Sequence, residues 1–296
     1  MQTLEALSRR IATTEDLRAI VRTMKSLSAV SIRQYEHAVA ALRDYTRTVE
    51  LALQVLLRDR PPAARATAAP RGPVLVVVFG SDHGLCGRFN DDIARFAQER
   101  LGELDAAGTP HRCLAVGARA EARLAARGEL AHERLSLPGS VSGLAMLAQA
   151  VLVQLDAWGA GSEVERVLLI YNRRAGATIA APHMRQLLPF SPERLRNLAA
   201  RRWPSRRLPT FTMEPGRLLS AVIRQYLFSS VYRAAAESLA SEHASRLASM
   251  QAAERTIAER LDEQHGEFRR VRQQTITEEL LDIVTGFEAS RAGFGA

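Results

Sequence analysis

The sequence has few cysteines, few aromatic residues and almost no lysine. Cys86 and Cys113 are its only cysteines, too few for a disulfide scaffold or a four-thiolate zinc site, which fits a reducing compartment. Aromatic residues make up 5% of the chain, a low share for a protein that binds nucleic acid by stacking on bases. Lys25 is the only lysine, and the net charge is +8. Because the arginines are spread along the chain, this charge is weak evidence about partners.

The sequence also lacks long apolar runs. No stretch reaches the roughly 18 consecutive apolar residues that a membrane-spanning helix needs. Glu5, Arg9 and Asp16 lie in the first 20 residues, where a signal peptide would have its uncharged core. We therefore expect neither a membrane span nor a secreted protein.

Helix-breaking residues are almost absent from both ends of the chain. All 12 prolines lie between Pro61 and Pro215, and most of the 18 glycines lie between Gly72 and Gly216. Since proline and glycine punctuate helices, their distribution predicts a helix, then a mixed domain, then a second helix.

Each end carries one apolar stripe at three- and four-residue spacing, which is typical of a helix. The N-terminal stripe covers residues 2–58 and the C-terminal one 217–288, lengths of about 85 and 108 Å at 1.5 Å per residue. Such helices must protrude, and the simplest way to cover both stripes is an antiparallel coiled coil. Two shorter, broken helices folded back on the central domain are the alternative.

The C-terminal arm is the longer one, by about 14 to 16 residues, so some ~20 Å of it has no partner within the chain. Its end is apolar on more than one side, which indicates that another protein surrounds it. The apolar residues there are Ile276, Leu280, Leu281, Ile283, Val284 and Phe287.

The centre of the chain reads as α/β. The runs 74–79, 113–116 and 167–171 are predicted strands, and 91–105, 117–127 and 143–158 are predicted helices. This alternation predicts a small parallel sheet covered on both faces. The expected organisation is a coiled-coil helix at 1–60, a linker at 61–73, the α/β domain at 74–189, an irregular connector at 190–216 and a coiled-coil helix at 217–296.

A glycine-rich loop, GSDHGLCG at residues 80–87, directly follows the first predicted strand. Doubly wound folds bind phosphates at this position, but the loop has neither P-loop nor G-x-G-x-x-G spacing. His83 with Cys86 could form a nucleophile and base, or a metal site with His111 and Cys113, yet the spacing supports neither. A tight turn whose glycines take positive φ is the favoured interpretation, and no residue is assigned to catalysis, a cofactor or a metal.

Arginines concentrate in one segment, RRWPSRR at residues 201–207. The segment could meet acidic lipid headgroups, a carboxylate-bearing partner or nucleic acid, or it could be a solvated loop. Nothing local decides between these.

Three segments resemble the gamma subunits of F-type ATP synthases, the rotating central stalk. They are IVRTMKSL at residues 20–27, SDHGLCG at 81–87, and SEHASR at 241–246 with RQQTITEELLDIVTG at 272–286. The resemblance departs at His83, where the family commonly has arginine, at Lys25, and at Phe287, which follows Gly286 in place of alanine. These departures suggest a divergent bacterial branch.

The resemblance implies a fold: a long antiparallel two-helix coiled coil formed by the two arms, plus a central Rossmann-like α/β domain. It also implies partners. The coiled coil would lie in the bore of the alpha and beta hexamer, and the α/β domain against the epsilon subunit and the c-subunit ring, peripheral on the cytoplasmic side of a bacterial membrane. No nucleic acid and no direct membrane span are expected.

The resemblance implies residues that contact the beta subunits. These are Met24, Arg246, Gln273, Thr277 and Glu279, and Lys25, next to Met24, is expected to contact the same partner. It further places Met24 near the segment 275–279, while Met24 and Thr277 could instead be coiled-coil core. A cytosolic coiled-coil adaptor with a Rossmann-like domain is the alternative function, and an enzyme using the 80–87 turn is a third.

Overall fold

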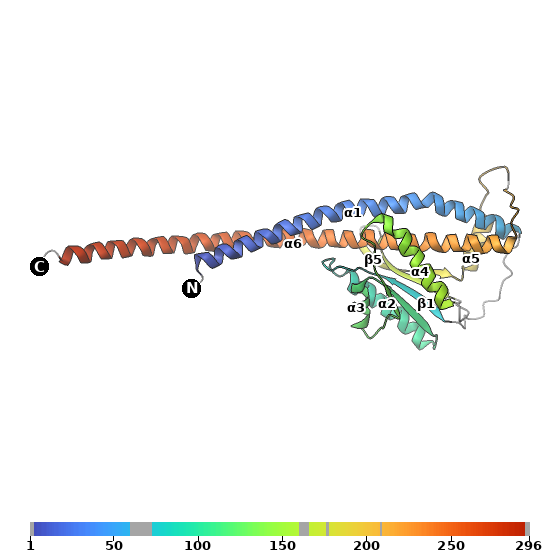
Figure 1. Cartoon of the computed structure of the whole chain (residues 1–296), viewed down its shortest axis with the longest axis horizontal. Helices are drawn as coiled ribbons and strands as arrows, with labels where there is room; N and C mark the ends of the chain where they lie inside the picture. The colour runs from blue at the N-terminus through green and yellow to red at the C-terminus, as the bar shows by residue number, and fades with distance from the viewer. Residues whose placement is uncertain (1–2, 60–72, 160–165, 176–177, 208, 294–296) are drawn as a thin grey trace. The chain divides into compact units, whose positions relative to one another are not determined.

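The computed structural model describes residues 3–59, 73–159, 166–175, 178–207 and 209–293. Most of the expected linker at 61–73 lies outside these residues. The elements, labelled in Figure 1, are α1 (Leu4–Asp59), β1 (Val74–Phe79), α2 (Phe89–Ala106), β2 (His111–Val116), α3 (Ala118–Ala125), β3 (Glu133–Leu135), a 3-10 turn (Val141–Gly143), α4 (Leu144–Gly159), β4 (Arg166–Ala175), β5 (Thr178–Leu188), α5 (Pro192–Ala200) and α6 (Pro215–Gly293).

Both arms are single long helices, as the absence of breakers predicted. Helix α1 has 56 residues and α6 has 79, a difference of 79 − 56 = 23, larger than the 14 to 16 expected. Gly266 and Gly286 lie inside α6 without ending it, as a single glycine costs a helix only about 1 kcal/mol.

Close contacts divide the chain into two compact units. Unit 1 comprises residues 1–27 and 248–296, and unit 2 comprises 28–247. Each unit therefore contains one piece of α1 and one piece of α6. The five-segment organisation expected from composition stays a prediction, and the contacts group the residues differently because both arms are shared between the units.

Unit 2 is built on a five-stranded sheet in the order β3-β2-β1-β4-β5. Strands β1, β2, β3 and β4 pair in parallel, and β5 pairs antiparallel with β4. The sheet is thus mixed rather than purely parallel. Strand β5 was not predicted from the sequence, because Pro182 lies inside it and proline is tolerated in a strand only at positions such as a sheet edge.

The two faces of the sheet carry alternate residues of β1, as the period of a strand requires. Val74, Val76 and Val78 pack against α2 and α3. Leu75, Val77 and Phe79 belong to the other core, which joins the sheet to α4, α1 and α6. Residues of α1 and α6 thus form part of the core of the α/β domain.

The expected irregular connector at 190–216 contains a helix. Helix α5 begins at Pro192 and has Glu193 in its first turn. Proline at the first helical position and an acidic residue beside it are ordinary helix-start signals. The prediction of an irregular connector was wrong because it counted the prolines only as helix breakers. The same region packs Leu195 and Leu198 against Leu53 and Tyr226 of the long helices.

One stretch of the described residues, Val141–Gly159, has the length and composition of a membrane-spanning helix, which the sequence analysis did not identify. Its helix α4 buries Leu144, Leu147 and Val151 in the core of unit 2. The packing identifies α4 as a core helix of the α/β domain.

Candidate functional site

In unit 1 the two helices run antiparallel (Figure 1), and an ion-pair cluster joins them. Lys25 Nζ lies 2.6 Å from Glu254 Oε2, and Arg22 Nε lies 3.1 Å from Glu254 Oε1. Hydrogen bonds from Lys25 and then Arg22 lower the pKa of Glu254 below its ordinary value. Lys25, expected to contact a partner, thus makes a contact within the chain that the sequence did not reveal.

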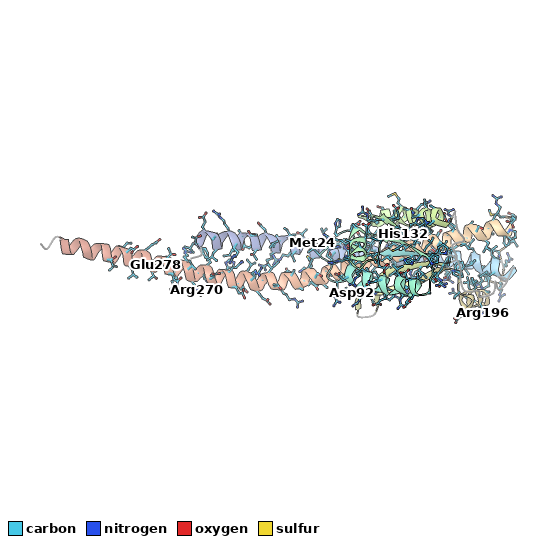
Figure 2. The ribbon with its side chains drawn as sticks, turned by 90° about the horizontal axis from the view of Figure 1, so that it is seen from below. Met24, Asp92, His132, Arg196, Arg270 and Glu278 are labelled. Carbon is cyan, nitrogen blue, oxygen red and sulfur yellow. The ribbon has the colours of Figure 1, made fainter. Side chains whose placement is uncertain are left out.

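The expectation that Met24 lies near residues 275–279 is wrong. Because Lys25 contacts Glu254, its neighbour Met24 lies beside that part of α6, some 20 residues and about 30 Å of helix from Thr275. Figure 2 shows Met24 separated from Glu278 along unit 1, with Arg270 between them. The register that the resemblance implied is therefore shifted in this chain, where the ion pairs of Lys25 and Arg22 with Glu254 set the pairing.

The C-terminal end of α6 is apolar and exposed. The exposed fractions of its side chains are 46% for Ile276, 58% for both Leu280 and Leu281, 68% for Ile283 and 52% for Val284. The side chain of Phe287 lies outside those described. The exposure agrees with the expected shortage of a partner within the chain.

Three of the expected contact residues lie next to this apolar end. Gln273, Thr277 and Glu279 are exposed, and Thr277 Oγ1 donates only to the carbonyl of Gln273 within its own helix, at 2.9 Å. Met24 is half-buried. Arg246 lies in unit 2, so the chain does not bring the six expected residues together.

The turn between β1 and α2 holds the glycine-rich motif. Gly87 has a φ of 60°, but the other residue of the turn with positive φ is Leu85, at 63°. Gly80 is required for a different reason: a Cβ there would lie 2.3 Å from Ala120 Cβ. The interpretation as a tight turn is therefore correct for Gly87, while Gly80 serves close packing.

Side-chain hydrogen bonds fix this turn. Asp82 Oδ1 accepts from the Ala118 amide at 2.8 Å, and Oδ2 from the Leu137 amide at 2.7 Å. Asn90 Oδ1 accepts from the Ser81 amide at 3.0 Å, and Asn90 Nδ2 donates to Ser81 Oγ at 2.7 Å. The polar residues of the motif therefore bind the chain's own backbone and side chains.

Cys86 has the surroundings of a structural thiol. Its Sγ lies 3.8 Å from the carbonyl oxygen of His83, so the contact is not with the imidazole. Burial, first of several causes, raises the pKa of the Cys86 thiol. Because the thiolate is the reactive form, this environment disfavours a nucleophile. No cluster of three or more histidine, cysteine or acidic side chains suited to a metal ion occurs in the described part of the chain.

Arg246 and Glu242 form a buried ion pair on α6. Arg246 Nη2 lies 2.6 Å from Glu242 Oε1, with side-chain exposures of 8% and 6%. The same Nη2 donates to the carbonyl of Gly84 at 3.3 Å, which ties α6 to the β1–α2 turn. Glu242 Oε2 is buried and has no hydrogen-bond partner among the described residues. Burial raises the pKa of Glu242 to about 7, against the lowering effect of Arg246.

Tyr35 of α1 and His243 of α6 stack beside this pair, with ring centroids 5.6 Å apart. Burial lowers the pKa of His243 to about 4, and Arg246 adds to the shift, so the imidazole is neutral at pH 7. Glu242 and His243 belong to the SEHASR motif at residues 241–246, but the sequence gives them no role, because only the fold shows which residues lie opposite them.

The arginine-rich segment forms an ordered turn after α5. Trp203 Nε1 donates to Ser205 Oγ at 3.1 Å and to the carbonyl of Arg207 at 2.9 Å. Arg201 Nη1 lies 3.5 Å from Glu50 of α1. The segment's partner stays open.

The two long helices, the five-stranded α/β sheet and the exposed apolar end of α6 define the class of protein: an α/β domain with long helical extensions. Residues 3–289 match the family model described as ATP synthase. The chain belongs to the ATP synthase family.

The relatives span the same length as this chain. The ATP synthase gamma chain of Geobacter metallireducens is 28% identical over 98% of this chain and 99% of its own length. That of Granulibacter bethesdensis is 29% identical over 98% and 100%. A structure of the OSCP, F1 and c-ring of the Euglena gracilis mitochondrial ATP synthase contains a chain of the same fold, with a TM-score of 0.65 and 18% identity over 99% of this chain and 96% of that one.

Proposed function

We propose that this chain is the central rotor stalk, the gamma subunit, of an F-type ATP synthase. It couples ion flow through a membrane ring to ATP synthesis or hydrolysis at the alpha and beta subunits. The observation that carries the proposal is the exposed apolar end of α6 in a chain of the ATP synthase family. An apolar surface of this kind marks a contact with a partner.

The partners follow from that role. The coiled coil lies in the bore of the alpha and beta hexamer, and the α/β domain contacts the epsilon subunit and the c-subunit ring. Because the rod is asymmetric and the surrounding hexamer is nearly threefold, each rod orientation favours a different set of beta-subunit conformations. The chain itself performs no chemistry, and it is peripheral on the cytoplasmic side of a bacterial membrane.

The adaptor alternative has no support in the comparisons, because the relatives given above match over nearly the whole chain and are gamma chains. An enzyme using the 80–87 turn is disfavoured by the bonds of that turn, since Asp82 and Asn90 are occupied by neighbouring residues.

Co-expression tests the proposal directly. The chain, carrying an affinity tag, is expressed with the alpha and beta subunits of its own organism. A parallel expression in which the chain has no tag is the control for non-specific binding to the affinity resin. We expect a stable complex that contains all three chains and hydrolyses ATP, while the purified chain alone does not. Separation of the chain from alpha and beta during purification contradicts the proposal, and so does ATP turnover by the chain alone.

A photo-crosslinking amino acid tests the contact residues in the same complex. Placed at Gln273 or Thr277, which are exposed near the apolar end of α6, it should crosslink to alpha or beta. The matched control is Leu130, which is 77% exposed in the α/β domain and should not crosslink to the hexamer. Crosslinks at Leu130 but not at Thr277 contradict the assignment.

A further inference from the structure

Several of the α6 residues in the core of unit 2 are small, beside the larger Val231 and Leu239. Ala234, Ala235, Ala236 and Ala240 are at most 4% exposed and belong to the core that includes the sheet. Small side chains let a helix lie close to its neighbours, but they offer few projections that interlock. Hydrophobic attraction is non-directional, so the alanines bring α6 close to the sheet, and a hydrogen bond or ion pair is the kind of contact that adds direction.

A directional contact lies one to three turns further along the same helix. Arg246 reaches the Gly84 carbonyl at 3.3 Å while it pairs with Glu242. Gly84 belongs to the turn that Asp82 and Asn90 fix to α3 and α2. The guanidinium therefore connects α6 to a braced part of the α/β domain.

This pair is unlike the other ion pairs of the described residues, in each of which at least one side chain is more than 30% exposed. Its burial is unfavourable, since Glu242 Oε2 has no hydrogen-bond partner among the described residues, and a buried pair is often less stabilising than apolar residues of the same volume. Stability alone therefore does not account for it. A buried polar contact can instead select one arrangement among similar ones, because every alternative leaves a charge unpaired.

We propose that Glu242 and Arg246 are positioning residues that fix the rotation of α6 relative to the α/β domain by anchoring the β1–α2 turn. Glu242 holds the guanidinium, and Arg246 makes the anchoring bond to Gly84. If α6 cannot rotate relative to the α/β domain, torque passes between the two without loss. This consequence rests on the proposed function.

Hydrogen exchange of the full-length chain tests the anchor independently of any complex. In Arg246→Met, which keeps the volume of the side chain, we expect amides of residues 81–88 to exchange at least tenfold faster, while those of α4 are unchanged. Glu242→Gln keeps the shape and an acceptor, and should give a smaller acceleration. Unchanged exchange at 81–88 in both variants overturns the proposal.

The matched control is Asp156→Asn. Arg224 of α6 pairs with Asp156 of α4 at 2.6 Å, and both side chains are more than 60% exposed. This pair also joins α6 to the α/β domain but lies in water, so its loss should leave exchange at 81–88 as in the wild type. Equal acceleration in Asp156→Asn and Arg246→Met overturns the specific role of the buried pair.

A charge exchange separates the anchor from a mere helix-stabilising pair. Measured at pH 8.5, Glu242→Arg combined with Arg246→Glu retains an i,i+4 pair but directs an ionised carboxylate, which cannot donate, toward the Gly84 carbonyl. Exchange at 81–88 should stay fast in this double variant. Wild-type exchange rates there show that the pair serves the helix alone and overturn the anchor.

The torque role is measured in membrane vesicles that contain the whole complex. Arg246→Met should lower the number of ions pumped per ATP hydrolysed, and Asp156→Asn should not. Wild-type pumping by Arg246→Met overturns the torque role. If the wild-type chain fails to assemble with alpha and beta, the proposed function fails, while the exchange results still decide the anchor.

Discussion

Two acidic residues of α6, twelve positions apart in sequence (254 − 242 = 12), meet opposite environments. Glu254 in unit 1 is partly exposed and accepts hydrogen bonds from Lys25 and Arg22, which lower its pKa. Glu242 in unit 2 is buried, and desolvation raises its pKa to about 7 although Arg246 lies beside it. The same residue type on one helix thus acquires opposite properties. The pKa of each carboxyl is therefore set by the groups that lie opposite it, and not by the helix that carries it.

The largest expected difference between the units concerns apolar side chains. Leu169 of β4 is fully buried in unit 2, whereas Leu280 in unit 1 is 58% exposed. Leu169→Ala should lower the free energy of unfolding by about 2–5 kcal/mol because it leaves a cavity. Leu280→Ala should change it by less than about 0.5 kcal/mol. Denaturant titration of the isolated chain measures both changes. Similar losses of unfolding free energy in the two variants would contradict the difference in burial between Leu169 and Leu280.

A smaller difference is expected within the β1–α2 turn, where two glycines differ in their surroundings. Gly80→Ala places a Cβ 2.3 Å from Ala120 Cβ, whereas nothing lies within 4 Å of one at Gly84. We expect Gly80→Ala to destabilise the chain by about 1–3 kcal/mol through overpacking. Gly84→Ala, the matched control, should stay within about 0.5 kcal/mol. A destabilised Gly84→Ala would show that the turn needs glycine flexibility rather than space at Gly80.

Opposite pH dependences should distinguish the two acidic residues. Burial raises the pKa of Glu242 to about 7 in the folded chain, against an ordinary value of 4.5. The protonated form therefore contributes stability that is lost as pH rises toward 7, above which the carboxylate pairs with Arg246. The lowered pKa of Glu254 gives a contribution present above about pH 4.5 and lost as pH falls.

Unfolding free energies from pH 3 to 8 measure both contributions. Glu242→Gln should remove the decline between about pH 4.5 and 7, and Glu254→Gln should remove part of the decline on the acid side. The titratable and charged groups around Glu242 are Tyr35, Asp82, Cys86, His243 and Arg246. Because the variant keeps all of them, the change in its pH profile reports the Glu242 carboxyl alone. An unchanged neutral-side profile in Glu242→Gln would contradict the buried assignment.

The smallest effect is expected for an exposed pair near the start of α1. Arg9 pairs with Glu5, and the side chains are 78% and 76% exposed. Solvent and salt weaken such pairs, so Glu5→Gln should cost less than about 0.5 kcal/mol. Thermal unfolding at low and high salt checks this. A loss as large as that of Leu169→Ala would mean that exposure does not govern these contributions.

The sequence by itself determined the two long helices, because residues 2–58 lack glycine and proline and carry apolar residues at helical spacing. It also determined the buried strands β1 and β4, because short apolar runs rich in β-branched residues favour strands over helices. The exposed apolar end of α6 followed from the greater length of that helix. These features depend on neighbours in sequence, so periodicity and composition report them.

Only the tertiary structure decided which residues meet. The pairing of Lys25 with Glu254, the antiparallel β5 at the sheet edge and the anchoring of Gly84 by Arg246 join residues far apart in the chain. A helical stripe is compatible with several registers, and a one-turn slip preserves its pattern while changing every partner. The environments of Glu242 and Glu254 depend on that register, because desolvation and hydrogen bonding act through space and not along the sequence.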